Sequence, residues 1–130
     1  MHTNSLKIME NLLGKYAPKE GLCVDVGSYN VNGTYRALVE GRGLAYLGVD
    51  IAAGPNVDIV CGEYEFSHLN MNADLVISGQ CLEHTRHPWK WIHDTRILLK
   101  DKAPLILIAP AMWPQHRYPV DCWRILPDGM

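Results

Sequence analysis

A glycine turn after an apolar run is the first feature of this chain that suggests chemistry. Asp25 and Gly27 end the run 22–26, and Gly33 lies near the start of the helix predicted next. Glycine lets the backbone approach a ligand closely and adopt positive φ, and the first turn of a helix offers free N–H groups to an anion. A plain tight turn has the same composition, so the turn alone leaves both interpretations open.

Asp50 supplies a second signal, because it ends the next apolar run, 45–49. In doubly wound folds, an acidic residue at the end of the second strand, roughly 20 residues beyond the glycine turn, binds a ribose diol. Each charge-assisted hydrogen bond to that carboxylate contributes about 1.5–3 kcal/mol. A solvated loop aspartate is the alternative. Together with the glycine turn, Asp50 predicts a nucleoside site.

The elements that position these residues follow from alternating apolar and helical patterns. Helical spacing predicts helices, and short apolar runs bounded by turns predict strands. Strands that are apolar on both faces and alternate with helices imply a parallel sheet covered on both sides. The sequence therefore predicts one α/β domain over residues 1–130, a doubly wound sheet that binds ligands beyond the carboxyl ends of its strands. The predicted helices are 6–16, 34–40 and 88–100, and the predicted strands are 22–26, 45–49, 57–61, 73–78 and 104–109.

Four ordered stretches resemble one known family. They read VDVGSYNVNGTYR, YLGVDIAAGPNVDIV, DLVISGQCLEHTRHPWKW and HRYPVDCWRILPDGM. Together they resemble the class I S-adenosylmethionine-dependent methyltransferases, most closely the methyltransferase type 11-like enzymes, over nearly all of residues 20–130. The resemblance implies a Rossmann-like sheet, S-adenosylmethionine as the cofactor and methyl transfer as the activity.

The resemblance assigns the cofactor's amino-acid, ribose and adenine parts to separate residues. The stretch 25–28 matches the segment that passes under the amino-acid part. Asp50 matches the ribose-binding acid, and Ile51 packs beside the adenine in this pattern. The family's adenine-binding aspartate would fall at Gly62, so Glu63 or backbone groups must replace it.

The floor of the methyl-transfer site falls just after the fourth predicted strand. Gly79 and Gln80 match that floor, and residues 82–84 match the L-E-H signature that is frequent in the family. The cofactor-binding residues predicted from the turn and the resemblance are Asp25, Gly27, Ser28, Gly33, Asp50, Ile51, Glu63, Gly79 and Gln80.

Length is the main departure from the family pattern. Such enzymes usually continue into a seven-stranded sheet, whereas this chain ends at Met130, after the fifth predicted strand. Residues 105–109 are apolar on both faces and would form an unpaired edge, which is an aggregation hazard. We therefore expect a C-terminally truncated chain, or a homo-oligomer or partner chain that covers this edge.

Two histidines are the candidates for catalysis. Methyl transfer from a sulfonium is an in-line displacement, so the protein mainly supplies alignment, and a base is needed only if the nucleophile must lose a proton. His84 and His116 are the candidate bases, with a structural role as the alternative. The spacing of Cys81, His84 and His87 suggests a metal, but no fourth ligand follows with zinc-like spacing, and we expect no metal from it.

Composition narrows the choice of partners and compartment. The net charge is −2 and the 12 basic residues are scattered, so no nucleic-acid partner is expected. The 4 cysteines form no C-x-x-C pair, which is typical of reduced thiols in the cytoplasm. No apolar segment approaches the roughly 20 residues of a membrane span.

The predicted function is methyl transfer from S-adenosylmethionine to a small-molecule acceptor or to a carbohydrate- or lipid-linked one. Trp113 and Trp123 fall in the segment that would shape the acceptor pocket, and an ion pair between Asp121 and Arg124 would tie that segment down. The first alternative is a non-catalytic cofactor-binding or interaction module. The second is a dinucleotide-dependent oxidoreductase, which Tyr29 disfavours because its bulk fills the second glycine position needed by a pyrophosphate.

Overall fold

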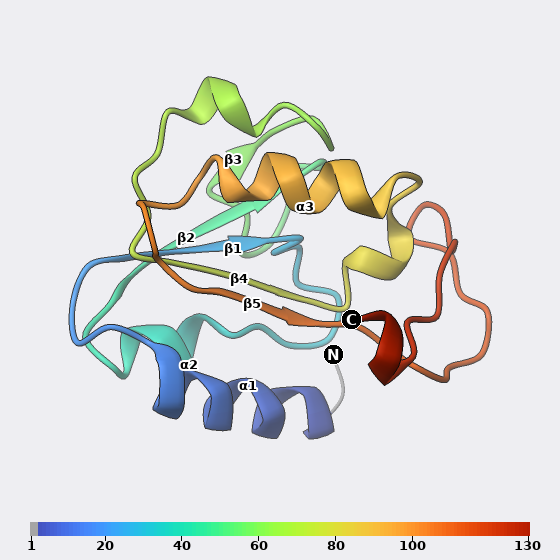
Figure 1. Cartoon of the computed structure of the whole chain (residues 1–130), viewed down its shortest axis with the longest axis horizontal. Helices are drawn as coiled ribbons and strands as arrows, with labels where there is room; N and C mark the ends of the chain where they lie inside the picture. The colour runs from blue at the N-terminus through green and yellow to red at the C-terminus, as the bar shows by residue number, and fades with distance from the viewer. Residues whose placement is uncertain (1–2) are drawn as a thin grey trace.

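The computed structural model describes residues 3–130, which form a fully parallel five-stranded sheet with helices on both faces (Figure 1). The strand order is β3-β2-β1-β4-β5. This arrangement confirms the predicted doubly wound α/β fold with a Rossmann-like sheet. The strands are β1 Leu22–Val26, β2 Ala45–Asp50, β3 Ile59–Val60, β4 Leu75–Gly79 and β5 Leu105–Ile108.

Two helices pack on one face of the sheet and one on the other (Figure 1). Helices α1 (Thr3–Tyr16) and α2 (Arg36–Glu40) share one apolar cluster with the sheet. Helix α3 (Pro88–Arg96) shares the second cluster through Trp91. Short 3₁₀ turns are η1 Phe66–Leu69, η2 Leu82–His84 and η3 Pro127–Gly129.

The strands alternate their apolar side chains between these two clusters. In β1, Cys23 joins the α1 side, whereas Val24 and Val26 join the α3 side. In β4, Ile77 faces α1 and Val76 faces α3. Because both faces of the central strands are buried, their sequences are apolar throughout, as expected of a covered parallel sheet.

The strand order reverses at β1, which lies between β2 and β4. Val26 pairs in register with Val49, and Asp25 with Ile77, so the three strands end at the same edge of the sheet. The loops that follow β1 and β4 lead to opposite faces, which opens a crevice at their carboxyl ends. This is the edge at which the sequence placed its candidate residues.

The structure corrects several predicted boundaries. The helix predicted for 88–100 ends at Arg96, because the backbone that follows bonds to Ala73: the Ala73 amide donates to the Leu98 carbonyl and the Lys100 amide to the Ala73 carbonyl. The strand predicted from Ala73 therefore starts at Leu75. The strand predicted for 57–61 shortens to Ile59–Val60, since the Val57 amide closes a turn on the Gly54 carbonyl.

The observed starts of helices α1 and α2 also differ from the predicted ones. Helix α1 already begins at Thr3, so Ser5 lies inside the helix, where its hydroxyl and the Tyr35 hydroxyl form a hydrogen bond of 2.6 Å. Helix α2 begins at Arg36 rather than at residue 34, because the Thr34 hydroxyl accepts the Arg36 amide and ends the preceding loop.

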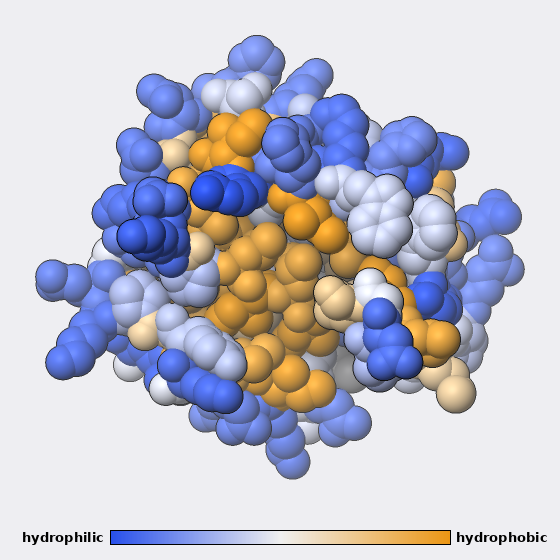
Figure 2. Space-filling model, in the orientation of Figure 1, coloured by the Kyte–Doolittle hydropathy of each residue, from blue (hydrophilic) through white to orange (hydrophobic). Residues whose placement is uncertain are grey.

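Strand β5 forms one edge of the sheet within the described residues. Hydrophobic side chains gather on this side, between α3 and α1 (Figure 2). Leu105 and Leu107 are only half-buried there. The apolar edge that the sequence predicted is therefore present. A second copy or a partner chain that covers this edge stays a prediction.

Two further predictions concern cysteines and membrane spans. Cys23, Cys61, Cys81 and Cys122 are all free thiols. Within residues 3–130, every helix is too short or too polar to cross a lipid bilayer.

Candidate cofactor and acceptor site

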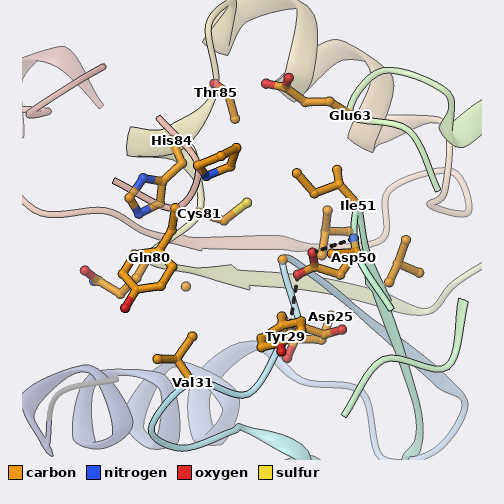
Figure 3. A pocket seen from close by; sticks show the side chains of 18 of the residues that line it. Asp25, Tyr29, Val31, Asp50, Ile51, Glu63, Gln80, Cys81, His84 and Thr85 are labelled. Atoms are coloured by element: carbon orange, nitrogen blue, oxygen red, sulfur yellow. Dashed lines mark hydrogen bonds between the residues drawn. The ribbon is translucent and has the colours of Figure 1, made fainter. Parts of the chain in front are cut away.

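A cavity of about 870 Å³ opens at the carboxyl edge of the sheet. The loops after β1, β2 and β4 form its walls together with residues 113–120. Asp50 and Ile51 lie on one side and Gln80, Cys81 and His84 on the other (Figure 3). Every residue predicted to bind the cofactor or to act in catalysis lines this cavity: Asp25, Gly27, Ser28, Gly33, Asp50, Ile51, Glu63, Gly79, Gln80, His84 and His116.

At Gly27 the loop after β1 packs tightly against the loop after β4. Its φ is +83°, and a Cβ there would lie 2.6 Å from the Cys81 Sγ. The amides of Gly27 and Ser28 both donate to the Val49 carbonyl, at 2.9 and 3.2 Å. Only glycine meets both the positive φ and the close approach, so the turn is built for contact between loops and not merely for reversal.

Tyr29, at the second glycine position, leans away from the glycine turn onto the loop after β2. A Cβ built on Gly54 would lie 2.2 Å from the Tyr29 ring, so the ring covers that glycine directly. The Asn30 amide donates to the Pro55 carbonyl at 2.9 Å and holds the two loops together. Tyrosine at this position therefore adds a side-chain contact between the loops after β1 and β2, which glycine could not make.

The Asp50 carboxylate is held by two backbone amides (Figure 3). The Tyr29 amide donates to its Oδ2 at 2.9 Å, and the Ala52 amide donates to its Oδ1 at 3.2 Å. Each carboxylate oxygen keeps further lone pairs for a ligand. The side chain is half-buried and lines the cavity, with the exposed Ile51 beside it. Its orientation is fixed before any ligand binds.

Asp25 lies beneath the cavity in a buried polar network that sequence patterns did not reveal. The Tyr46 hydroxyl donates to its carboxylate at 2.5 Å, and Asn56 Nδ2 donates to the Tyr46 hydroxyl and to the Ser28 carbonyl, each at 2.8 Å. Burial raises the pKa of Asp25 to about 7. In the sequence, the one sign of this network is that Asp25 is an acidic residue inside an apolar strand. The network links the glycine turn to the loop after β2.

Arg36 closes this network at the surface. Its guanidinium lies 4.2 Å from the Tyr46 ring centroid and donates to Asn56 Oδ1 at 2.8 Å and to Asp58 Oδ2 at 2.7 Å. The Gly48 amide donates to the same Asp58 oxygen, and this bond is the main reason that the pKa of Asp58 is lowered. Helix α2 is thereby tied to the strand that carries Asp50.

The loop after β4 forms the opposite wall under more strained geometry. A Cβ on Gly79 would lie 2.1 Å from the Tyr35 hydroxyl, so side chains are excluded there. Gln80 follows with φ +63°, a conformation that costs a non-glycine residue on the order of 1–3 kcal/mol. Its amide donates to the Ile108 carbonyl at 2.8 Å. Burial raises the pKa of the Cys81 thiol, which therefore stays protonated.

Glu63 is already engaged by its neighbours. Its Oε1 accepts the Tyr64 hydroxyl at 2.7 Å and the Arg86 amide at 3.3 Å. It lies on the side of the cavity nearest the end of β3. Its position therefore leaves one carboxylate oxygen available where the family pattern has an aspartate.

His84 and His116 meet at the far end of the cavity. Their ring centroids lie 4.8 Å apart in an edge-to-face contact. His84 Nδ1 contacts the Val120 carbonyl at 2.5 Å, and burial lowers the pKa of this histidine. Glu83 is completely buried beside it, and burial raises the pKa of that carboxyl to about 7. In the sequence, Glu83 was notable only as part of the L-E-H signature, and no role was predicted for it.

The C-terminal segment is fastened to η2 by backbone and side-chain bonds. The Cys122 and Trp123 amides donate to the Glu83 carbonyl at 2.8 and 3.1 Å, and Trp123 Nε1 donates to the Thr85 carbonyl at 2.9 Å. These bonds bring an irregular segment against the end of β4 without any regular pairing.

The predicted ion pair between Asp121 and Arg124 is confirmed. The guanidinium meets both carboxylate oxygens, at 2.7 and 2.9 Å, and holds the pKa of Asp121 well below its usual range. The same carboxylate accepts the His116 amide at 2.7 Å. The pair therefore sets the position of His116 in the cavity wall.

The similarity of this chain to known proteins lies in its fold. No protein-family model and no curated protein matches the chain. A crystal structure from Methanococcus maripaludis, provisionally described as an S-adenosyl-L-methionine-dependent methyltransferase, superposes with a TM-score of 0.62 at 16% identity over 82% of this chain. A provisionally described sarcosine dimethylglycine methyltransferase from Galdieria sulphuraria superposes with a TM-score of 0.52 at 18% identity over 79%.

The chain has the class I methyltransferase fold. It spans 55% of the first neighbour's length and 42% of the second's. In a doubly wound sheet, ligands bind in the crevice beyond the carboxyl ends of the strands, here β1, β2 and β4. The cavity described above occupies that edge.

Proposed function

We propose that this chain binds S-adenosylmethionine and transfers its methyl group to a small-molecule acceptor or to a carbohydrate- or lipid-linked one. One observation carries the proposal: the Asp50 carboxylate, fixed by two backbone amides, faces the same cavity as the Gly27 turn. The fold shared with the two structural neighbours supports it.

The residues present fit such a cofactor. The cavity volume of about 870 Å³ lies within the roughly 300–1,000 Å³ range of ligand pockets. The Ser28 hydroxyl is buried with no hydrogen-bond partner among residues 3–130, and the backbone of Gly27 lines the cavity beside it. Asp50 would hold the ribose, Ile51 and Glu63 the adenine, and residues 25–28 the amino-acid part.

The cofactor, when bound, supplies a methyl group already activated by its sulfonium. The chain's contribution is alignment, which accounts for several kcal/mol of a barrier of this kind. Gly79 and Gln80 would form the floor beneath the reacting atoms. Where the acceptor must lose a proton, His84 and His116 lie at the acceptor end of the cavity to take it up. Trp113 and Tyr118 would cover the acceptor and exclude water.

A non-catalytic binding module, completed by a second copy or a partner chain, is the second candidate. The apolar outer edge of β5 favours it, because half-buried Leu105 and Leu107 lie on that open side of the sheet. Binding of the cofactor without turnover on any acceptor would favour the module. We expect a cytoplasmic location and no nucleic-acid partner, in line with the free thiols and the scattered basic residues.

Ligand-dependent melting tests the proposal. Stabilisation follows RT ln(1 + [L]/Kd), about 2.7 kcal/mol at a hundredfold excess over Kd. S-adenosylhomocysteine should raise the melting temperature, and NAD should leave it unchanged. Asp50→Ala should abolish the shift, whereas Asp101→Asn, at a side chain that is 82% exposed, should retain it. A full shift in Asp50→Ala, or an equal shift with NAD, would overturn the proposed site.

A further inference from the structure

Glu83, His84 and His116 form a cluster of which the proposed function uses only the two histidines, as bases, and leaves Glu83 without a role. One potential ligand atom from each lies within 4.8 Å of the other two. His84 and His116 line the cavity, and Glu83 lies behind them. The metal-like spacing in the sequence involved Cys81, His84 and His87 instead. The three residues come together only because the C-terminal segment folds against η2, so spacing in the sequence does not predict the cluster.

The two histidines are oriented alike. His84 Nδ1 contacts the Val120 carbonyl at 2.5 Å, which fixes it as the protonated nitrogen and leaves Nε2 with its lone pair. His116 Nδ1 lies 3.3 Å from the Pro114 carbonyl and 3.7 Å from Asp121 Oδ2. Metal-binding histidines almost always direct their second ring nitrogen to a carbonyl or carboxylate in this way.

Glu83 is the third donor, and its burial needs an explanation. Its side chain is 0% exposed, and neither carboxylate oxygen has a hydrogen-bond partner on another residue within the described part of the chain. A buried carboxylate is costly unless it is paired or coordinates a metal. His84 Nε2 lies 3.8 Å from Glu83 Oε1, too far for a hydrogen bond. Metal bonds of about 2.0–2.2 Å place neighbouring ligand atoms about 3–3.5 Å apart, so the cluster, whose ligand atoms lie within 4.8 Å of one another, would have to contract around the ion.

We propose that Glu83 and the Nε2 atoms of His84 and His116 bind a divalent transition-metal ion at the acceptor end of the cavity. Two imidazoles and one carboxylate are a ligand set of Zn²⁺ and Fe²⁺ centres that keep open positions. Mg²⁺ and Ca²⁺ prefer sites made of oxygen alone. Asp121 supports His116 from behind and is neutralised by Arg124.

The open positions of this ion face the cavity, because both histidines line it. An ion there would bind an oxygen of the acceptor, or a water, and favour its deprotonated form. In the metal-bound protein, the ion therefore takes the place of an imidazole base. This assignment does not depend on S-adenosylmethionine binding, so the two proposals succeed or fail separately.

Calorimetric titration of the full chain with Zn²⁺ tests the site, with Cys122→Ser as the parent because the exposed Cys122 thiol is a competing ligand. We expect one Zn²⁺ per chain and a higher melting temperature. His116→Ala should weaken binding at least about 100-fold, since loss of an outer-shell partner alone costs 10–100-fold. His93→Ala, at an exposed histidine of α3, should bind like the parent.

Glu83→Gln keeps the side-chain shape and removes the charge, so it tests the buried donor. It should weaken Zn²⁺ binding as His116→Ala does, while the far-ultraviolet circular dichroism stays that of the parent. If Glu83→Gln fails to fold, His116→Ala decides, because His116 is only half-buried. Zn²⁺ binding that is absent in the parent, or equal in His116→Ala and His93→Ala, would overturn the proposal. Neither result depends on methyl transfer.

Discussion

The two walls of the cavity are built in different ways. The wall that carries Gly27 and Asp50 comes from the ends of adjacent paired strands, and backbone amides hold both its loops. The wall that carries His84 and His116 joins a 3₁₀ turn to a segment without regular structure, more than 30 residues away along the chain. Two backbone amides on the Glu83 carbonyl and side-chain bonds from Trp123 and Asp121 fix that second wall. The first wall is a property of the sheet, and the second depends on a few contacts.

This difference predicts that damage to each wall stays local. A change at the tip of β1 should affect cofactor binding and leave Zn²⁺ binding intact. A change in the C-terminal segment should do the reverse. Three substitutions probe the two walls, from the largest expected effect to the smallest, and the last of them measures both affinities.

Gly27→Ala should have the largest effect, because it should both destabilise the fold and abolish ligand binding. It places a Cβ at φ +83° and 2.6 Å from the Cys81 side chain, which we expect to lower the free energy of unfolding by roughly 2–4 kcal/mol and to remove the melting shift with S-adenosylhomocysteine. Gly43→Ala is the matched control, because Gly43 has φ +84° but a Cβ there would meet only the Lys19 carbonyl, at 3.7 Å. Gly43→Ala should lose stability and keep the shift. Loss of the shift in both variants would mean that backbone strain, and not the site, is being measured.

Asp25→Asn should change the pH dependence of stability. Burial raises the pKa of Asp25 from 3.8 to about 7, so between these values the native state keeps a proton that the unfolded chain releases. Stability should therefore fall as the pH rises through this window, by on the order of 3 kcal/mol from pH 5 to pH 7 at about 1.4 kcal/mol per pKa unit. Urea unfolding at pH 5 and pH 8 measures the difference. The wild type should lose more stability than Asp25→Asn on going to pH 8; parallel losses in the two proteins would contradict the assignment.

Asp121→Asn should have the smallest effect and act on the other wall. It weakens the bond to the His116 amide and the pair with Arg124, so Zn²⁺ affinity should fall about tenfold while S-adenosylhomocysteine affinity stays unchanged. Both affinities are measured by calorimetry, with the exposed Asp128 changed to Asn as the control. If cofactor affinity falls as far as Zn²⁺ affinity, the two walls are coupled and the comparison fails.

Sequence patterns anticipated the first wall and much less of the second. Gly27 and Asp50 were predicted because each lies at the end of a strand, and the ends of paired strands meet at one edge of the sheet. The helix predicted to 100 ends at Arg96 because the backbone after it bonds to Ala73, a long-range contact that periodicity does not encode. Glu83 and His116 were not linked, since their meeting depends on how the segment after β5 folds back.

A crystal structure of the chain with S-adenosylhomocysteine tests the central claim most directly. We expect both ribose hydroxyls on the Asp50 carboxylate, with the sulfur toward the wall formed by Gln80 and Cys81. A ligand bound outside the cavity, or bound within it with its ribose away from Asp50, would contradict the proposed site.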